Sequence, residues 1–600
     1  MQIRMLTVVC VAMACAAGAG AEAKHVYFGD THLHSAISAD AYLMGNRSAD
    51  PDTAYRYAKG LPVVHPGTGV RVQIDVPLDF LAVSDHAEFL GVIPALFSGD
   101  ARVGDSDRAR RFLSSMQGAR PHEAFLILTQ IGSSGVRDPG FESKDINAES
   151  WRKITEAADG HYEPGAFTTL VAWEWSSMPA GTGGGSFQGA NLHRVVVMRE
   201  GGEVARRFLP FSAFDSQRPE DLWQWLETRK AVDDASLLAI PHNSNIGFGR
   251  MFDTVMSDGA PIDAAYAQTR MRWEPVAEVT QFKGDSETHP FLSPDDEFAD
   301  YELFVTAGQE PSPGDFVRSS MLRGLEIAAR SGANPYAFGM IGASDSHTGL
   351  ASVEETNYYS KWGGQSRPRE MFGEGQGRGD IMGAAGLAAV WANENSREAI
   401  FDALKRREVY ATTGTRLRVR FFGGFDFAKR DLRVDDPAKP GYRKGVPMGG
   451  VLESGKEAPR FLVHAEKDPV GANLDRIQII KGWVDEAGQA HEKIFDVAMS
   501  DEQRRRAGEN ETRAVGNTVD LETGRYTNDI GEPRLHAVWT DPEWRSGQRA
   551  FYYARVLEIP TPRHSLLDAI ALGRSHPEDL PPTVQERAYT SPIHLVPEGG

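Results

Sequence analysis

Short apolar runs alternate with amphipathic segments over the first two thirds of the chain. Seven runs predict β-strands, at residues 25–29, 80–84, 168–175, 194–198, 237–240, 277–280 and 340–343. Apolar residues at helical spacing predict helices between them, at residues 149–158, 218–230, 315–330 and 396–407, with Ser396 as an N-cap. Several strands are almost continuously apolar, which is typical of parallel strands covered on both faces. The alternation over residues 24–414 predicts an α/β fold, and seven strands suit a barrel.

The pattern changes after Gly414. Strand-like runs separated by turn residues now follow one another, at residues 416–422, 460–466, 475–483, 493–498, 534–539 and 551–558. A short helix is predicted at residues 565–572, and the tail returns through residues 592–596. We therefore expect residues 415–600 to form an antiparallel β domain with a tail, placed against the barrel of residues 24–414.

Residues 1–23 have the pattern of a cleaved secretory signal. A basic residue, Arg4, precedes a short apolar run that ends in the small-residue motif of residues 21–23. The run is too short to span a membrane, and no later segment is long and apolar enough to do so. We expect a periplasmic protein with no membrane span. A lipid anchor at Cys15 is not expected, because the residues before it fit that signal poorly.

Composition narrows the classes of partner and of metal ligand. The chain has 64 Lys and Arg against 83 Asp and Glu, a net charge of −19, so no nucleic acid partner is expected. Its only 2 cysteines, Cys10 and Cys15, lie in the predicted signal. The exported chain would therefore have no disulfide and no thiolate ligand, but it keeps all 17 histidines of the sequence.

Histidines and carboxylates recur at or near the ends of the predicted strands. His32 and His34 follow the first strand and face the same side, because side chains along a strand alternate with a period of two. Later strands carry His86, Glu174, His193, His242, and Asp345 with His347. Strand ends converge on one face of a barrel, and buried polar groups are stabilised when they share metal ions. This ordered set predicts a metal centre.

The same order of residues resembles the polymerase-and-histidinol-phosphatase (PHP) superfamily of metal-dependent phosphoesterases. The chain looks like an exported branch of that superfamily that is labelled as a domain of unknown function. The resemblance covers residues 30–414 and implies a distorted (β/α)7 TIM-like barrel whose nine ligands hold up to three metal ions. Carried over to this sequence, the ligands are His32, His34, Asp40, His86, Glu174, His193, His242, Asp345 and His347. Asp85 and Glu88 are expected to orient His86 or His34 through hydrogen bonds.

Nitrogen and oxygen ligands without thiolates suit two or three divalent ions, Zn²⁺, Mn²⁺ or Fe²⁺. The expected reaction is attack of a metal-bridging hydroxide on a phosphomonoester or phosphodiester. His242, Asp345 and His347 are expected to take part in catalysis, for example as proton shuttles. Arg250 and Lys283 are expected to bind a small phosphorylated substrate, and Glu287 is a further candidate to face it.

Two other functions stay open at this point. The same metal chemistry could cleave an amide or a lactone, or the protein could be a non-catalytic exported binding protein stabilised by metal. A basic side chain beside the metals would favour the phosphoesterase, whereas a closed metal site would favour the binding protein. Glycine-rich residues 180–189 and 354–386 are expected to be long loops, of the kind that often cover a functional site.

Overall fold

The computed structural model describes residues 24–118, 120–182, 189–304, 309–373, 378–434, 436–501 and 513–597. The predicted signal at residues 1–23, most of the glycine-rich segment 180–189 and part of the segment 354–386 lie outside these residues. None of the helices in the described ranges has the length and apolar character needed to cross a membrane.

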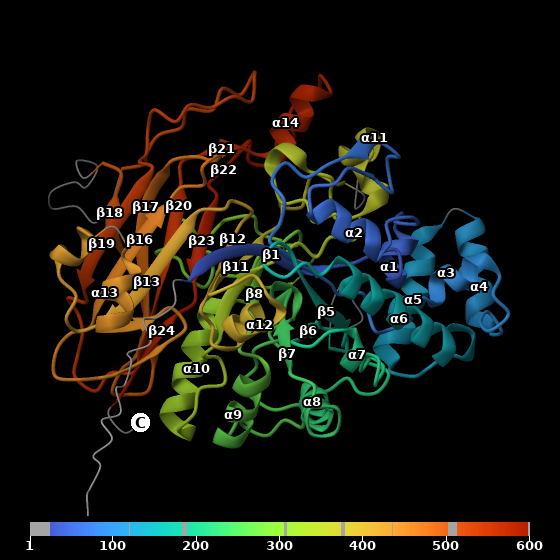
Figure 1. Ribbon diagram of the computed structural model, residues 1–600, viewed down its shortest axis with the longest axis horizontal. Helices are drawn as coiled ribbons and strands as arrows, with labels where there is room; N and C mark the ends of the chain where they lie inside the picture. The colour runs from blue at the N-terminus through green and yellow to red at the C-terminus, as the bar shows by residue number, and fades with distance from the viewer. Residues whose placement is uncertain are drawn as a thin grey trace, which may run out of the picture.

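A large mixed sheet runs through the middle of the protein (Figure 1). Before Gly414 it contains β1 (His25–Leu33), β4 (Phe80–Val83), β5 (Thr168–Trp175), β6 (Arg194–Met198), β7 (Leu237–Pro241), β11 (Leu387–Ala392) and β12 (Val409–Thr412). After Gly414 it contains β15 (Val451–Glu453), β17 (Leu474–Val484), β18 (Ala490–Met499), β20 (Ala550–Glu558), β23 (Arg587–Thr590) and β24 (Ile593–Val596). Its main path is β15–β24–β20–β23–β12–β11–β1–β4–β5–β6–β7, and β17 pairs with β18 and β20. One sheet therefore contains strands from both sides of Gly414, where the sequence predicts a domain boundary. The boundary stays a prediction.

Strand direction in this sheet differs from the expectation of parallel strands. β1, β4 and β5 are parallel neighbours, but β6 is antiparallel to both β5 and β7. No helix lies among the described residues of the connection 176–193, and an antiparallel neighbour needs no crossover helix. His193 therefore stands at the start of β6, beside Glu174 near the end of β5.

A second sheet lies beside the first. It contains β8 (Val276–Gln281), β9 (Gly284–Asp285) and β10 (Gly339–Gly342), and β10 is parallel to β8. β8 contacts β7, and β10 contacts β11 and β12, but no ladder between described residues joins the two sheets. The protein is thus a mixed α/β protein with a large central sheet, and closure into a barrel stays a prediction.

The third sheet is antiparallel and belongs to the C-terminal part, drawn in orange to red in Figure 1. Its order is β14 (Gly445–Pro447), β13 (Arg418–Gly424), β16 (Arg460–Glu466) and β19 (Arg534–Thr540). All six strands predicted after Gly414 are present, in this sheet or in the central one. The remaining short strands are β2 (Val63–Val64), β3 (Arg71–Val72), β21 (Thr561–Pro562) and β22 (Thr583–Val584).

Helices lie on the outside of the central sheet (Figure 1). The four predicted helices are confirmed as α6 (Lys144–His161), α8 (Pro219–Asp233), α10 (Val317–Ser331) and α12 (Arg397–Lys405). The Ser396 side chain accepts a hydrogen bond from the N–H of Ala399 and so caps α12, as predicted. The others are α1 (Ala39–Leu43), α2 (Pro51–Ala58), α3 (Val92–Ser98), α4 (Asp107–Gln117), α5 (Pro121–Ser134), α7 (Gly202–Ala205), α9 (Ala264–Trp273), α11 (Pro368–Met371), α13 (Ala438–Lys444) and α14 (His564–Ala571).

Two buried carboxyl groups make the stability of the fold depend on pH. Burial raises the pKa of Glu558 to about 8 and that of Glu586 to about 8. The folded state thus binds these protons more tightly than the unfolded state. The resulting stabilisation is lost as the pH rises from the pKa of the carboxyl groups in the unfolded chain to their pKa of about 8 in the folded protein. In the wild type the free energy of unfolding should therefore fall with rising pH over that range. We expect Glu558→Gln to make the slope of this fall smaller, by up to about 1.4 kcal/mol per pH unit.

Urea titrations of the wild type and the variant at a series of pH values would measure this difference. Glu156→Gln, at an exposed position of α6, is the matched control and should leave the slope unchanged. Equal slopes for Glu558→Gln and the wild type would contradict the assignment.

Candidate metal centre

β1 delivers His32 and His34 to one buried point at its C-terminal end. The Nε2 atoms of the two rings are 3.2 Å apart. On the far side of each ring, Nδ1 of His32 lies 3.0 Å from Oε2 of Glu278, and Nδ1 of His34 lies 2.8 Å from Oγ of Ser38. Both rings therefore present Nε2 to the same place.

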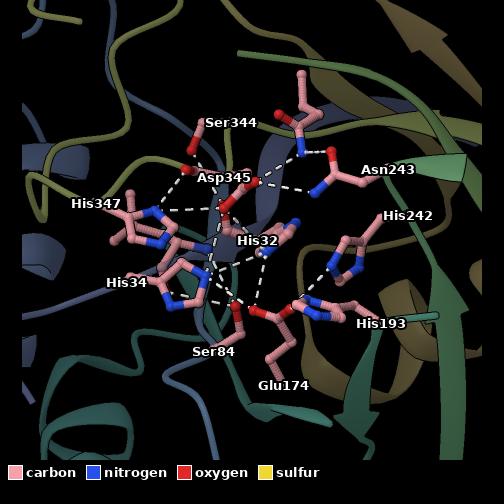
Figure 2. A network of polar contacts seen from close by, with 12 residues as sticks. His32, His34, Ser84, Glu174, His193, His242, Asn243, Ser344, Asp345 and His347 are labelled. Atoms are coloured by element: carbon pink, nitrogen blue, oxygen red, sulfur yellow. Dashed lines mark hydrogen bonds and ion pairs between the residues drawn. The ribbon is translucent and has the colours of Figure 1, made fainter. Parts of the chain in front are cut away.

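Glu174 directs its carboxylate toward several of the histidines (Figure 2). Its Oε1 is 2.5 Å from Nδ1 of His193 and 3.0 Å from Nε2 of His242. Its Oε2 is 3.0 Å from Nε2 of His34 and 3.3 Å from Nδ1 of His86. One carboxylate thus contacts histidines from four segments of the chain, which is the arrangement of a bridging ligand.

Asp345, His347 and Asp40 complete the cluster. Oδ1 of Asp345 lies 3.4 Å from Nε2 of His32 and 3.5 Å from Nε2 of His34. Oδ2 of Asp40 lies 2.8 Å from Nε2 of His347 and 3.3 Å from Nε2 of His86. All nine predicted ligands therefore belong to one connected network. Three of its subsets place their donor atoms within 4.8 Å of one another: His34, Asp40, His86 and His347; His32, His34 and Asp345; and His32, Glu174 and His242.

The donor atoms fit a group of divalent ions. In five of the histidines Nδ1 lies beside a polar group of the protein. That group is Glu278 for His32, Ser38 for His34, Ser176 for His86, the carbonyl of Ile240 for His242 and the carbonyl of Asp345 for His347. Such contacts fix the ring and the tautomer of a ligating histidine. Nε2 of His193 is buried and has no hydrogen-bond partner within the described chain, and Oε2 of Glu174 faces only imidazole nitrogens. Imidazole and carboxylate donors left free in this way suit Zn²⁺, Mn²⁺ or Fe²⁺.

Burial and facing charges set the protonation of the rings. Burial lowers the pKa of His193 to about 4 and that of His347 to about 3, which keeps both rings in the neutral form that binds metals. Burial also acts to lower the pKa of His32, but the carboxylates of Asp345 and Glu278 overcome it and raise the pKa to about 10. The carboxylates therefore make the cluster a site that attracts positive charge.

Two lysines reach Asp345. Nζ of Lys283 lies 2.9 Å from Oδ2, and Nζ of Lys361 lies 2.6 Å from Oδ1. Gln281 and Asn243 donate to Oδ2 as well, at 2.7 and 3.3 Å. Burial lowers the pKa of Lys361 to about 7 against the opposing attraction of Asp345, so its ammonium form depends on a facing anion. Lys283 was predicted from the sequence, whereas Lys361 was not.

Two further residues, Arg250 and Glu287, were expected to face substrate. Arg250 is exposed, and no contact within the described chain joins it to the cluster. Glu287 instead forms a buried ion pair with Arg318, at 2.7 Å, and receives the hydroxyl of Tyr553. The expectation for Glu287 is therefore wrong, because its carboxylate balances a buried guanidinium of α10. The role of Arg250 gains no support from its position.

Supporting contacts surround the donors. Asp85 accepts hydrogen bonds from the N–H and the hydroxyl of Ser35, both at 2.7 Å, next to His34. Glu88 accepts the N–H of Ser176, whose hydroxyl lies 2.5 Å from Nδ1 of His86. Asp85 thus contacts the residue next to His34, and Glu88 contacts the residue that contacts His86.

Sequence reasoning missed Glu278 and Asp30, and of the side chains around Asp345 it missed Lys361, Gln281 and Asn243. Asp30 accepts the N–H groups of His32 and Ser344, at 2.9 and 3.0 Å, and so ties β1 to the chain after β10. Glu278 lies inside the buried strand β8, where an ionised side chain is costly unless it has a partner. A carboxylate within an apolar run was the signal that could have identified both residues.

Glu278→Ala is expected to weaken metal affinity about 10- to 100-fold, because Nδ1 of His32 loses the acceptor that orients its ring. Competition with a chromogenic chelator would measure the affinity. Glu278→Gln, which keeps an acceptor oxygen, should lose less. Equal affinity of the wild type and Glu278→Ala would show that Glu278 does not support the ligand.

Comparisons with known proteins place the chain in a family. A solved structure from Bacteroides vulgatus, of a two-domain protein containing a predicted PHP-like metal-dependent phosphoesterase, is similar at 12% identity with a TM-score of 0.27. The match covers 88% of this chain and 90% of that chain. No curated protein matches the chain. Residues 21–597 match one family throughout, and the chain belongs to that family, described as "Protein of unknown function (DUF3604)".

Proposed function

We propose that this protein is an exported, metal-dependent hydrolase of small phosphoesters, with the PHP type of barrel formed by residues 24–414. The observation that carries the proposal is the convergence of the nine donor residues on one buried network with lysines at its edge. The proposed ligands are His32, His34, Asp40, His86, Glu174, His193, His242, Asp345 and His347. They would hold two or three Zn²⁺, Mn²⁺ or Fe²⁺ ions. Residues 1–23 would direct the chain to the periplasm.

Bound divalent ions supply Lewis acidity and make hydroxide available near neutral pH. The chain itself positions the donors. When His242 and His347 act as ligands, the carbonyls of Ile240 and Asp345 would accept the proton on each Nδ1, which directs the lone pair of each Nε2 toward the cluster. Gln281 holds the carboxylate of Asp345 through Oδ2. We assign these three residues, His242, Asp345 and His347, to the reaction itself, as ligands that can also exchange protons.

Substrate would enter where the cluster is open. The side chains of Asp40 and Lys283 are each 18% exposed and that of His86 is 14% exposed, whereas Glu174 and Asp345 are 2% exposed. Lys283 therefore brings a positive charge to the accessible side, where it would bind an oxygen of the phosphoryl group. A neutral amide or lactone offers no anionic group to this ammonium, and a purely structural metal site needs no opening.

Metal analysis and hydrolysis assays test the proposal. Protein purified without chelators is expected to contain divalent metal and, after loading with Mn²⁺ or Zn²⁺, to hydrolyse members of a panel of phosphomonoesters and phosphodiesters. Chelation should remove the activity, and metal should restore it. A loaded protein that hydrolyses amides or lactones but no phosphoester would overturn the proposed substrate class. Protein without bound metal would overturn the site.

A further inference from the structure

Lys361 is a buried cation that no pattern in the sequence singles out. Its side chain is 1% exposed, and Nζ lies among the backbone oxygen of Asp345, the Oδ1 atom of Asp345 and Nδ1 of His347, at 2.5, 2.6 and 2.8 Å. It belongs to the long glycine-rich segment 354–386, not to a strand end. A buried ammonium needs a facing anion or acceptor for each of its hydrogens.

One of these three contacts is lost when His347 acts as a ligand. A neutral imidazole carries one hydrogen, so Nδ1 can accept from Lys361 only if the hydrogen is on Nε2. A ligating Nε2 requires the hydrogen on Nδ1, where the carbonyl of Asp345 lies 2.9 Å away to accept it. In the ligating tautomer Lys361 therefore keeps its two contacts to Asp345 and has one hydrogen available for another oxygen.

The charges of the site favour an anionic partner for that hydrogen. The carboxylates that face the donors are Asp40, Glu174, Glu278 and Asp345. With two or three divalent ions bound, these four carboxylates would face at least four metal charges and the two ammonium groups of Lys283 and Lys361, so the groups in contact with the donors would carry a net positive charge. A phosphate monoester carries close to two negative charges at neutral pH, whereas a phosphodiester carries one. The two lysines thus match a dianion.

The backbone is built to hold Lys361 in place. Ser360, immediately before it, has φ of 62°, and Asp345 and Asn243 have φ of 54° and 53°, a left-handed conformation that is uncommon outside glycine and recurs at functional sites. The carbonyl of Lys361 accepts the N–H of His347 at 2.9 Å. Gly363 lies so close to Gly67 that a Cβ on Gly67 would stand 1.7 Å from the carbonyl oxygen of Gly363. The chain around Lys361 is therefore fixed at both ends.

Trp362 adds an aromatic wall beside the same group. Its ring centroid lies 4.3 Å from that of His347, and Nζ of Lys361 lies 5.0 Å from the Trp362 ring. This contact keeps the ammonium directed toward the donor cluster and screens that side from water.

We propose that Lys361 is a specificity-determining residue that, together with Lys283, binds the oxyanion of the substrate and selects a dianionic phosphoryl group over a monoanionic one. The inference rests on the proposed function, because it assigns a substrate preference to the same site. Lys283 would receive the anion at the open side, and Lys361 would donate from the buried side of Asp345.

Binding of small anions tests the assignment without turnover. Isothermal titration of metal-loaded protein with inorganic phosphate and with dimethyl phosphate would be compared for the wild type, Lys361→Met, Lys283→Met and the control Lys405→Met, at an exposed position of α12. We expect Lys361→Met and Lys283→Met to weaken phosphate binding about tenfold or more and dimethyl phosphate binding less, with unchanged metal content. Lys405→Met should bind both anions as the wild type does.

Phosphate affinity in Lys361→Met within twofold of the wild-type value would overturn the inference. Loss of metal from this variant would also overturn it, because Lys361 would then support the metal ligands rather than bind substrate. If Lys361→Met does not fold, Lys283→Met and the charge-retaining Lys361→Arg decide. Unchanged phosphate affinity in Lys283→Met would count against the inference. So would a loss of phosphate affinity in the charge-retaining Lys361→Arg as large as the loss expected when the charge is removed. Lysine-dependent phosphate binding without hydrolysis of any phosphoester would contradict only the proposed function.

Discussion

Glu174→Gln is expected to lower metal occupancy and to reduce hydrolysis by at least about 100-fold, more than loss of a supporting contact costs. Both oxygens of Glu174 face histidines, with Oε1 near His193 and His242 and Oε2 near His34. An amide places a neutral NH₂ group where one of these oxygens stands, and that group cannot ligate a metal through its nitrogen. The substitution thus keeps the volume of the side chain and removes its charge and one donor.

Elemental analysis of the purified variant and assays across the phosphoester panel would measure the two effects. Glu156→Gln makes the same chemical change on the exposed face of α6 and should retain full metal content and activity. Full occupancy in Glu174→Gln would exclude Glu174 as a bridging ligand.

Asp296→Asn is expected to lower the free energy of unfolding by about 3–5 kcal/mol, because the buried guanidinium groups of Arg318 and Arg555 are then left to share the one buried carboxylate of Glu287. Asp296 lies 2.8 Å from Nη2 of Arg318 in α10 and 2.6 Å from Nη2 of Arg555 in β20. All three side chains are buried. The network thus joins a helix of the N-terminal part to a strand of the C-terminal part.

The same contacts fix the pH dependence of this effect. Burial acts to raise the pKa of Asp296, but Arg555 and Arg318 hold it well below its usual range. Its stabilising contribution is therefore present above the unfolded pKa and is lost only as the pH falls through the folded pKa. Near neutral pH the full destabilisation of Asp296→Asn should be seen.

Urea unfolding at neutral pH would measure the loss. Asp402→Asn breaks a surface pair with Arg199 at 3.2 Å, in which the side chains are 51% and 34% exposed, and should cost about 1 kcal/mol or less. Equal losses in the free energy of unfolding for the two variants would show that the buried network stabilises the fold no more than a surface ion pair does.

The candidate site was largely visible in the sequence because its residues follow local rules. His32 and His34 share a face through the period of a strand, and Asp345 and His347 repeat that spacing. The structure brings His34 into contact with Glu174 and His347 into contact with Asp40, and the members of each pair lie far apart along the chain. The order of donor types could be read locally, whereas their distances depend on the pairing of strands.

Cations were harder to predict than ligands. Arg250 and Lys283 were both chosen for their nearness in sequence to a strand end, and only Lys283 reaches Asp345. Lys361 lies in a long irregular segment whose course has no periodicity, so no pattern placed it at the cluster. Glu287 looked like a substrate contact until the fold placed Arg318 beside it.

By itself, the sequence determined the α/β character of the first part, the β character of the second and the identity of the strand-end donors, because apolar periodicity and strand-end chemistry are local properties. Asp40 joined the candidate donors only through the resemblance to a family. Only the tertiary structure decided that β6 runs antiparallel and that one sheet crosses Gly414. It also decided that Lys361 and Glu278 surround the donors. These features depend on contacts between segments distant along the chain, and such contacts are selected by packing of the whole molecule rather than by any local pattern.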